Sequence, residues 1–279
     1  MDGFYQIKEN ELRLPGVTGE HVFLHISDTH ISVSDDLSTG EEREKAETQE
    51  ESWQKQRKSF AEAFHEPFHP EHTAPSREVL HKLFAYAKEV RPECFLLSGD
   101  ILDYRHPAGF RLLEKELSDY GGEYLFAPGN HEGNYESHPE LTAFNRGSAG
   151  VTVYHGDGFL IAALDDSKKT VFDRQLEEFR AISEGSVPAV LLTHIPIATA
   201  QNEAEMKRFG DYFSISEKSE DENARELVRL LSDPDCAVCA ILCGHVHGYH
   251  SSVYAGEKRQ ICASSGLVGF VHRFTVRGI

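Results

Sequence analysis

The sequence of 279 residues has no long apolar run. No stretch approaches the roughly 18 consecutive apolar residues that a membrane-spanning helix needs. The N-terminus also lacks a basic segment followed by an apolar run, which marks a secretory signal. We therefore expect a cytoplasmic protein that has no membrane partner.

Cysteine is scarce, with five residues whose odd number and irregular spacing do not suggest a disulfide framework. Cys236 and Cys239 form a C-x-x-C pair, a spacing found in zinc and redox sites. No second such pair exists to complete a structural zinc site. Because the segment from Cys236 to Cys243 is apolar, we expect its thiols to be buried in a strand.

Basic residues are also few, with 28 Lys and Arg against 46 Asp and Glu, which gives a net charge of −18. Nonspecific nucleic-acid binders normally carry a basic stripe, so nucleic acid is not an expected partner. Acidity does not exclude phosphate chemistry, because bound metal ions can dominate the field inside a site. The sequence carries no signal for an oligomeric state.

Short apolar runs alternate with amphipathic segments along most of the chain. Strands that alternate with helices predict a layered α/β protein, and hairpins predict mixed sheets. We expect an opening hairpin over 5–14 that turns at Glu9 and Asn10. Without repeats or low-complexity linkers, 1–279 is expected to form a single domain. The expected helices are 76–90, 108–120, 139–145, 171–183 and 223–231, and the further strands are 21–26, 94–98, 124–127, 151–154, 159–164, 189–193, 237–242, 251–254, 259–263 and 272–276.

Residues 34–76 interrupt this alternation. The segment 41–64 is rich in Glu, Lys, Gln and Ala, and Trp53, Phe60 and Phe64 are spaced to share one helical face. Prolines follow it, which end helices. We predict an inserted, largely exposed helix followed by an irregular loop.

Five short segments place metal-binding residue types directly after predicted strands. Ligands gather at the carboxyl ends of strands in open α/β sheets. On an extended backbone, residues two apart point to the same face, so Asp28 and His30 are expected to meet one ion, and His245 and His247 repeat that spacing. The five segments are Asp28-Thr29-His30, Gly99-Asp100, Gly129-Asn130-His131, His194 and Gly244-His245-Val246-His247.

Each segment alone has an ordinary explanation as a solvated strand end or a turn. Their joint occurrence after apolar strands, far apart in sequence, favours one site for two metal ions, which usually handles phosphate oxygens. Nitrogen and oxygen donors without thiolate suit Mn²⁺, Fe or Zn²⁺. Gly99, Gly129 and Gly244 are expected to allow close backbone approach or positive φ there.

In order and residue type, these segments resemble the calcineurin-like metallophosphoesterases. That family's pattern runs D-x-H, G-D-x-x-D/N, G-N-H-D/E, a lone H and G-H-x-H. The chain supplies DTH at 28–30, GDILD at 99–103, GNHE at 129–132, His194 and GHVH at 244–247. The resemblance covers roughly residues 20–265 and implies an αββα sandwich of two mixed sheets flanked by helices.

The resemblance also implies a role for each matching residue. It places Asp28, His30 and His247 on a first metal, Asn130, His194 and His245 on a second, and Asp100 between the two. A hydroxide that bridges the metals would attack phosphorus in line. His131 would protonate the leaving oxygen, and Asp103 would orient His131. Glu132 matches a family position for which the resemblance gives no firm role.

The chain departs from the Ser/Thr protein phosphatases of the family at one position. Those relatives carry a phosphate-binding Arg directly after the GDxxD block, where this chain has Tyr104. Arg105 and Arg146 are the remaining candidates for that task. Protein phosphatase activity is therefore disfavoured.

The sequence thus predicts a dimetal-dependent hydrolase of a small-molecule phosphodiester or phosphomonoester, nucleotides and cyclic nucleotides included. Two alternatives stay open: a DNA or RNA nuclease, which shares the motif pattern, and a scaffold that keeps the fold without catalysis. Segments 34–75 and 200–221 directly follow His30 and His194, so we expect them to form the rim and select the substrate.

Overall fold

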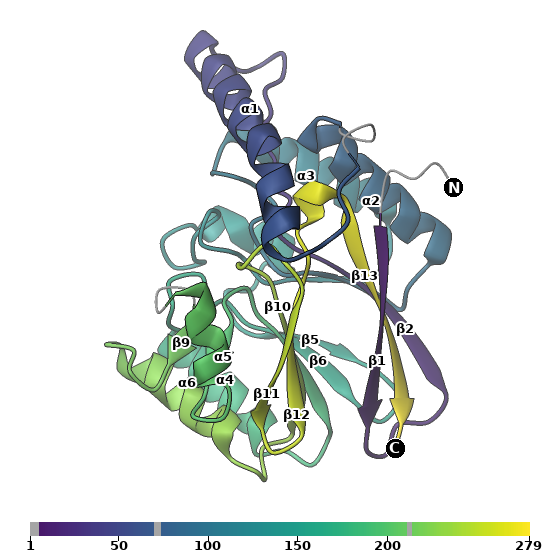
Figure 1. Ribbon diagram of the computed structural model, residues 1–279, viewed down its shortest axis with the longest axis vertical. Coiled ribbons are helices and arrows are strands. Elements are labelled where there is room, and N and C mark those ends of the chain that lie inside the picture. The colour runs from purple at the N-terminus through teal and green to yellow at the C-terminus, as the bar shows by residue number, and fades with distance from the viewer. Residues whose placement is uncertain (1–5, 70–73, 211–213) are drawn as a thin grey trace.

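A computed structural model of the chain describes residues 6–69, 74–210 and 214–279. Two β-sheets pack against each other, and helices cover their outer faces (Figure 1). The predicted αββα arrangement of mixed sheets is therefore confirmed. Pro70 and His72 of the proline-rich loop lie outside the described residues.

The first sheet has the strand order β1-β13-β2-β3-β4. β2, β3 and β4 run parallel, so their carboxyl ends share one edge. β13 is antiparallel to β2 and parallel to β1. The strands are β1 (Gln6–Leu14), β2 (Glu20–Ile26), β3 (Cys94–Leu97), β4 (Tyr124–Phe126) and β13 (Phe270–Gly278).

The second sheet has the order β11-β12-β10-β7-β6-β5. Its central strands β6, β7, β10 and β12 are parallel, and the outer strands β5 and β11 are antiparallel to their neighbours. The strands are β5 (Thr152–His155), β6 (Leu160–Ala163), β7 (Ala189–Leu192), β10 (Val238–Cys243), β11 (His250–Ala255) and β12 (Lys258–Cys262). The expected burial of thiols holds for Cys236 and Cys243, whereas Cys239 is half-buried.

Alternating side chains of the central strands divide the core into layers. In β3, Phe95 and Leu97 pack under the helices, while Leu96 faces the second sheet. In β7, Leu191 faces its helices and Val190 faces the first sheet. Because both faces of these strands are buried, they appear in the sequence as continuous apolar runs.

Four helices cover the outer faces of the two sheets, and local sequence features set where they begin and end. α2 (Ser76–Val90) and α3 (Pro107–Tyr120) pack on the first sheet, and α4 (Asp173–Ser183) and α6 (Glu222–Ser232) on the second. Pro107 opens α3, and Gly121 ends it with φ of 65°. The Asp221 carboxylate accepts from the backbone N–H of Ala224 at the start of α6. Shorter elements are η2 (Pro139–Asn145), β8 (Ile197–Ala198), α5 (Glu203–Met206), η3 (Lys207–Phe209), β9 (Ile215–Ser216) and η5 (Gly266–Val268).

The expected opening hairpin is wrong. β1 is one strand that passes through Glu9 and Asn10 without turning and pairs with β13 along its whole length. The alternation of side chains continues in phase across Glu9 and Asn10, and no Gly or Pro forces a turn there. Tyr5 of the expected hairpin lies outside the described residues.

The inserted segment forms helix α1 (Gly40–Ala63), which projects beyond the edge of the sheets (Figure 1). Thr39 and Glu42 cap it reciprocally: Thr39 Oγ1 accepts from the Glu42 N–H at 3.2 Å, and Glu42 Oε2 from the Thr39 N–H at 2.7 Å. Lys55–Glu51 and Lys58–Glu62 ion pairs lie on its exposed side. Throughout the described ranges, the helices fall short of the length and apolar character that a membrane span requires.

Candidate functional site

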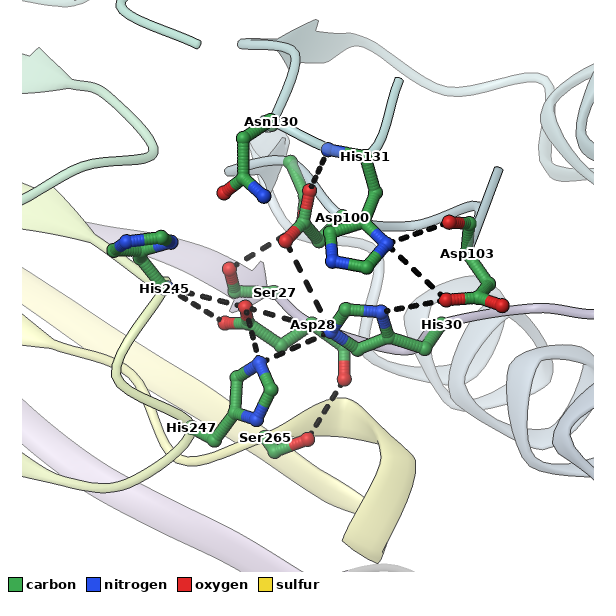
Figure 2. Close-up of polar contacts among 12 residues, drawn as sticks. Ser27, Asp28, His30, Asp100, Asp103, Asn130, His131, His245, His247 and Ser265 are labelled. Atoms are coloured by element: carbon green, nitrogen blue, oxygen red, sulfur yellow. Dashed lines mark hydrogen bonds and ion pairs between the residues drawn. The ribbon is translucent and has the colours of Figure 1, made fainter. Parts of the chain in front are cut away.

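All five predicted segments leave the carboxyl ends of parallel strands and converge where the two sheets meet. Figure 2 shows this meeting point around Asp28, Asp100 and His245. The first sheet contributes most of them through the loops after β2, β3 and β4. The second sheet contributes the remaining histidines. The residues are Asp28 and His30 after β2, Asp100 and Asp103 after β3, Asn130 and His131 after β4, His194 after β7, and His245 and His247 after β10.

A first group of possible ligands consists of Asp28, His30, Asp100 and His247, with one ligand atom from each within 4.8 Å of all the others. His30 Nε2 and His247 Nε2 face each other at 3.0 Å. His247 Nε2 also lies 3.4 Å from Asp28 Oδ1. Two imidazole nitrogens directed at one point beside carboxylates fit a shared cation. We call this group the first subsite.

A second group consists of Asp100, His194 and His245. His194 Nε2 lies 3.1 Å from Asp100 Oδ2 and 3.2 Å from the side-chain oxygen of Asn130. The other ring nitrogen of His194 contacts the carbonyl of Ser98 at 2.7 Å, which fixes the ring. We call Asn130, His194 and His245, with Asp100, the second subsite. Asp100 belongs to both groups, as a bridging ligand must.

The buried carboxylates make this cluster strongly attractive to cations. Burial raises the pKa of Asp28, and the charge of Asp100 raises it further. Burial alone would lower the pKa of His194, but the nearby Asp100 and Asp28 carboxylates raise it to about 10. A protonated His194 would thus partly neutralise the cluster in the absence of metal. The donor set and its charge fit a dinuclear metal site.

His245 and His247 are held neutral, the state in which imidazole binds metal. Burial lowers the pKa of His245 to about 3, and the charge of His194 acts in the same direction. Burial and the neighbouring His30 also lower the pKa of His247.

His131 and Asp103 form a pair beside the first subsite. His131 Nδ1 lies 3.1 Å from Asp103 Oδ1 and 2.6 Å from the Asp103 carbonyl. Burial would lower the pKa of His131, but the hydrogen bond with Asp103 and the charge of Asp100 raise it to about 9. The backbone N–H of His131 donates to Asp100 Oδ1 at 2.8 Å, so this segment also orients Asp100.

The backbone at the site differs from the extended conformation that the sequence suggested. Asp28, His30, Asp100, His245 and His247 all have positive φ, between 44° and 69°. Non-glycine residues reach this left-handed region only at a cost of about 1–2 kcal/mol each. Asp28 and His30 still meet in one subsite, but through two left-handed turns. Such strain concentrates at functional sites.

The three predicted glycines provide close approach. A Cβ on Gly129 would lie 2.1 Å from Asp100 Oδ1, and one on Gly244 would lie 1.8 Å from Ser27 Oγ. Gly99 has φ of 80°, and its Cβ would collide with the backbone of Gly129. Any side chain at these positions would displace a loop that carries candidate ligands.

Two carboxylates have structural roles that the motifs did not reveal. Glu132 is fully buried and accepts from the backbone N–H groups of Asp100, Leu102 and Gly129 at 2.7–2.8 Å. It thereby ties together the loops after β3 and β4. Asp166 accepts from the N–H groups of His194 and Ile195. No sequence signal marked Asp166, which follows β6 without any motif.

Two aromatic residues of α1 lie on the first subsite. The Trp53 ring stacks on His30 with centroids 3.9 Å apart, and Phe60 meets His247 edge-on at 4.6 Å. Their spacing predicted a shared helical face. It carried no information on what that face would cover.

The candidates for a phosphate-binding arginine separate clearly. Arg146 pairs with Glu123 and donates to the carbonyl of Tyr124, at the end of β4 opposite the site. Arg105 is exposed and donates to the Glu132 carbonyl at 3.1 Å, beside the loop after β4. Tyr104 stacks on His106. Of the two arginines, only Arg105 lies at the rim of the site.

The motif pattern agrees with comparisons to known proteins. A family model described as calcineurin-like phosphoesterase matches residues 21–249. A protein of Rhodococcus erythropolis named "Probable cyclic nucleotide phosphodiesterase" is 26% identical over 204 residues, 68% of this chain, and the chain spans 62% of that relative's length. A crystal structure of a dimetal phosphatase from Danio rerio shares the fold, with a TM-score of 0.53, 12% identity and 88% of each chain covered. With its five motif blocks assembled at one edge and the family model matching most of its length, the chain belongs to the calcineurin-like phosphoesterases.

Proposed function

We propose that the protein hydrolyses a phosphoester bond of a small molecule at the two subsites. The first subsite would hold one ion through Asp28, His30 and His247, and the second would hold another through Asn130, His194 and His245. Mn²⁺, Fe and Zn²⁺ fit these donors. When bound, two such ions polarise the phosphoryl oxygens and acidify a water molecule.

The position of Asp100 carries this proposal. Its carboxylate belongs to both ligand groups, and its two oxygens are fixed by different partners. Oδ1 accepts from the His131 N–H, while Oδ2 lies 3.1 Å from His194 Nε2. One buried carboxylate therefore couples the two subsites into a single centre.

His131 is the group we assign to the leaving oxygen. Asp103 holds its Nδ1, so Nε2 is left to face a substrate bound beside Asp100. The His131 side chain is 33% exposed, unlike the fully buried His30 and His194. It can therefore reach a bound phosphoester and donate a proton to the departing alcohol.

We assign the substrate to phosphodiesters of nucleotide size, with cyclic nucleotides included. The name of the Rhodococcus erythropolis relative supports this choice. A cavity of about 680 Å³ lies between the segments that follow β6 and β7, and its lining carries both signs of charge: Lys168, Lys169, Lys207 and Lys218 together with Glu203, Glu220 and Asp221. Lys169 is close enough to His245 to contribute to its lowered pKa. Lys207 and Lys218 pair with Glu203, and Lys168 and Lys169 are the lining cations that we assign to a substrate carrying negative charge.

A panel assay tests this proposal. Wild-type protein with added Mn²⁺ is compared on phosphomonoesters, phosphodiesters and cyclic nucleotides, together with Asp100→Asn and His245→Ala. We expect diester hydrolysis by the wild type and loss of nearly all activity and of bound metal in both variants, while circular dichroism shows an intact fold. Full activity in both variants would contradict the mechanism. Salt-sensitive cleavage of single-stranded DNA as the dominant activity would favour a nuclease.

A further inference from the structure

The two subsites differ in their surroundings. His30 of the first subsite is fully buried, and the His247 side chain is 13% exposed. In the second subsite His194 and His245 are also buried, but Asn130 is exposed and the adjacent His131 is partly so. The open side of the centre therefore lies at Asn130, and something covers the other side.

The cover is the inserted helix α1. Trp53 lies flat on His30, with an interplanar angle of 23°, and Phe60 stands at 90° to His247. These are the same two imidazoles whose Nε2 atoms face each other in the first subsite. Trp53 also lies 5.7 Å from the His247 ring and 6.1 Å from the His131 ring.

The sequence of α1 suits this contact. Trp53 and Phe60 are its only aromatic residues, and seven residues correspond to about two helical turns, so they share a face. Most other positions of the helix are polar and exposed. An otherwise polar helix thus presents its aromatic side chains to metal-ligand imidazoles.

The end of α1 is fixed beside His247. Phe64 packs on Gly248, where a Cβ would lie 2.0 Å from the Phe64 ring. Glu66 is 4% exposed and accepts from Lys8 at 3.1 Å, from the Tyr249 N–H at 3.2 Å and from the Ser264 hydroxyl. These contacts tie the helix to β1 and to the segment after β10.

We propose that α1 is a fixed aromatic lid on the first subsite, which rests on the proposed function of the same centre. Trp53 and Phe60 hold the imidazoles of His30 and His247 in place and exclude water from them. An ion at the first subsite is therefore released slowly, and the phosphoester approaches past Asn130. Trp53 and Phe60 are positioning residues, since they act through the ligands.

Metal release is the main test. Protein loaded with Zn²⁺ is mixed with an excess of a chromogenic chelator, and the release of Zn²⁺ is followed in time. We expect two phases in the wild type, and a slow phase faster by roughly 10-fold or more in Trp53→Ala and Phe60→Ala, as is typical when groups that orient ligands are removed. Trp53→Phe should restore most of the slow release. Gln56→Ala, on the exposed side of α1, should match the wild type.

A second variant separates the lid from local misfolding. Glu66→Ala keeps both aromatic residues and the contacts of Gln54 and Arg57 with Ala74 but removes the anchor beside His247. It should therefore also accelerate the slow phase, with circular dichroism unchanged. An unchanged slow phase in Trp53→Ala and Phe60→Ala would overturn the lid even if the protein hydrolyses phosphodiesters normally. Absence of hydrolysis with the expected release kinetics would instead overturn the proposed function and leave the lid intact.

Trp53 provides an independent readout, because it is the only tryptophan in the chain. Co²⁺ quenches nearby indole fluorescence, whereas Zn²⁺ does not. Titration of metal-free protein with Co²⁺ should therefore quench Trp53 in step with metal binding, and Zn²⁺ should cause little loss. Binding of two Co²⁺ ions without quenching would place Trp53 away from the site and contradict the lid.

Discussion

At the scale of single residues, His131 and Asp103 differ from the proposed metal ligands in exposure and partners. His131 is partly exposed and fixed at Nδ1, whereas the imidazoles of His30 and His194, which we propose as ligands, are buried. The sequence motifs predicted these two classes from the family pattern. The structure adds that the His131 N–H also orients Asp100, so replacing the side chain leaves that backbone contact in place.

His131→Gln should therefore lower hydrolysis in a way that depends on the leaving group. For diesters of poor leaving groups such as alcohols, we expect kcat to fall about 10²–10⁴-fold, because general acid catalysis is lost. For p-nitrophenyl esters the loss should be far smaller, since p-nitrophenolate needs no proton to depart. Steady-state kinetics on both substrate types measures this difference. His138→Gln, on the same segment, is the control, and equal losses on both substrates would argue against the acid role.

The buried His25 should make stability depend on pH. It lies in β2 against Ser98, with Nε2 2.6 Å from the Ser98 hydroxyl, and burial lowers its pKa to about 3. Between pH 3 and the ordinary His pKa of 6.5, the unfolded chain binds a proton at His25 that the folded chain does not bind. The free energy of unfolding is therefore highest above pH 6.5 and decreases as the pH falls below 6.5. At pH 5 this residue should cost about 2 kcal/mol of unfolding free energy.

Urea unfolding at pH 7 and pH 5, for the wild type and His25→Gln, measures that loss. From pH 7 to pH 5, the free energy of unfolding should decrease by about 2 kcal/mol less in His25→Gln than in the wild type, whatever the stability of the variant at pH 7. His272 is also buried with a lowered pKa; burial is the main cause in both proteins, and the smaller effect of His25 on it disappears in the variant. An identical decrease in unfolding free energy in the two proteins would show that His25 is protonated in the folded protein at pH 5.

At the scale of elements, the sequence predicted the strand ends and helices better than what they contact. α1 was predicted from its composition and aromatic spacing, because helical periodicity is a local property. Its docking on His30 and His247 depends on Gly248 and Glu66, which are far apart in sequence. For β1 the alternation of side chains correctly predicted extended backbone, but the hairpin was wrong. Only the pairing with β13 distinguishes one long strand from a hairpin.

The segment after His194 remains predicted to select the substrate. Together with Lys168 and Lys169 it lines the cavity of about 680 Å³. Lys168→Ala should raise KM for nucleotide substrates about two- to fivefold with kcat unchanged, because one exposed charge contributes less than about 1 kcal/mol. The effect should shrink in high salt. Lys55→Ala on α1 is the matched exposed control, and an unchanged KM would remove Lys168 from the binding surface.

At the scale of the whole molecule, the centre joins the two sheets. The His245 N–H donates to both oxygens of Asp28 at 3.1 Å, and His194 contacts the Ser98 carbonyl, so each bond links the loops of one sheet to those of the other. The family could be predicted from the sequence because the loops at the strand ends contain all five of the family's motif segments. The left-handed backbone and the Glu132 and Asp166 contacts could not, since they follow from how the two sheets meet.

Metal should therefore stabilise the entire fold rather than one loop. Each ion that binds only the folded state at about 100-fold excess over its Kd contributes about 2.7 kcal/mol, which corresponds to roughly 5–10 °C in Tm per ion for a chain of this size. Thermal unfolding in Mn²⁺ and in EDTA, followed by circular dichroism, should show this difference in the wild type. Asp100→Asn should abolish most of it, because the variant lacks the carboxylate that both subsites share. A scaffold that keeps the fold without binding metal would show the same Tm in both solutions, so this comparison distinguishes an enzyme centre from a vestigial one before any substrate is known.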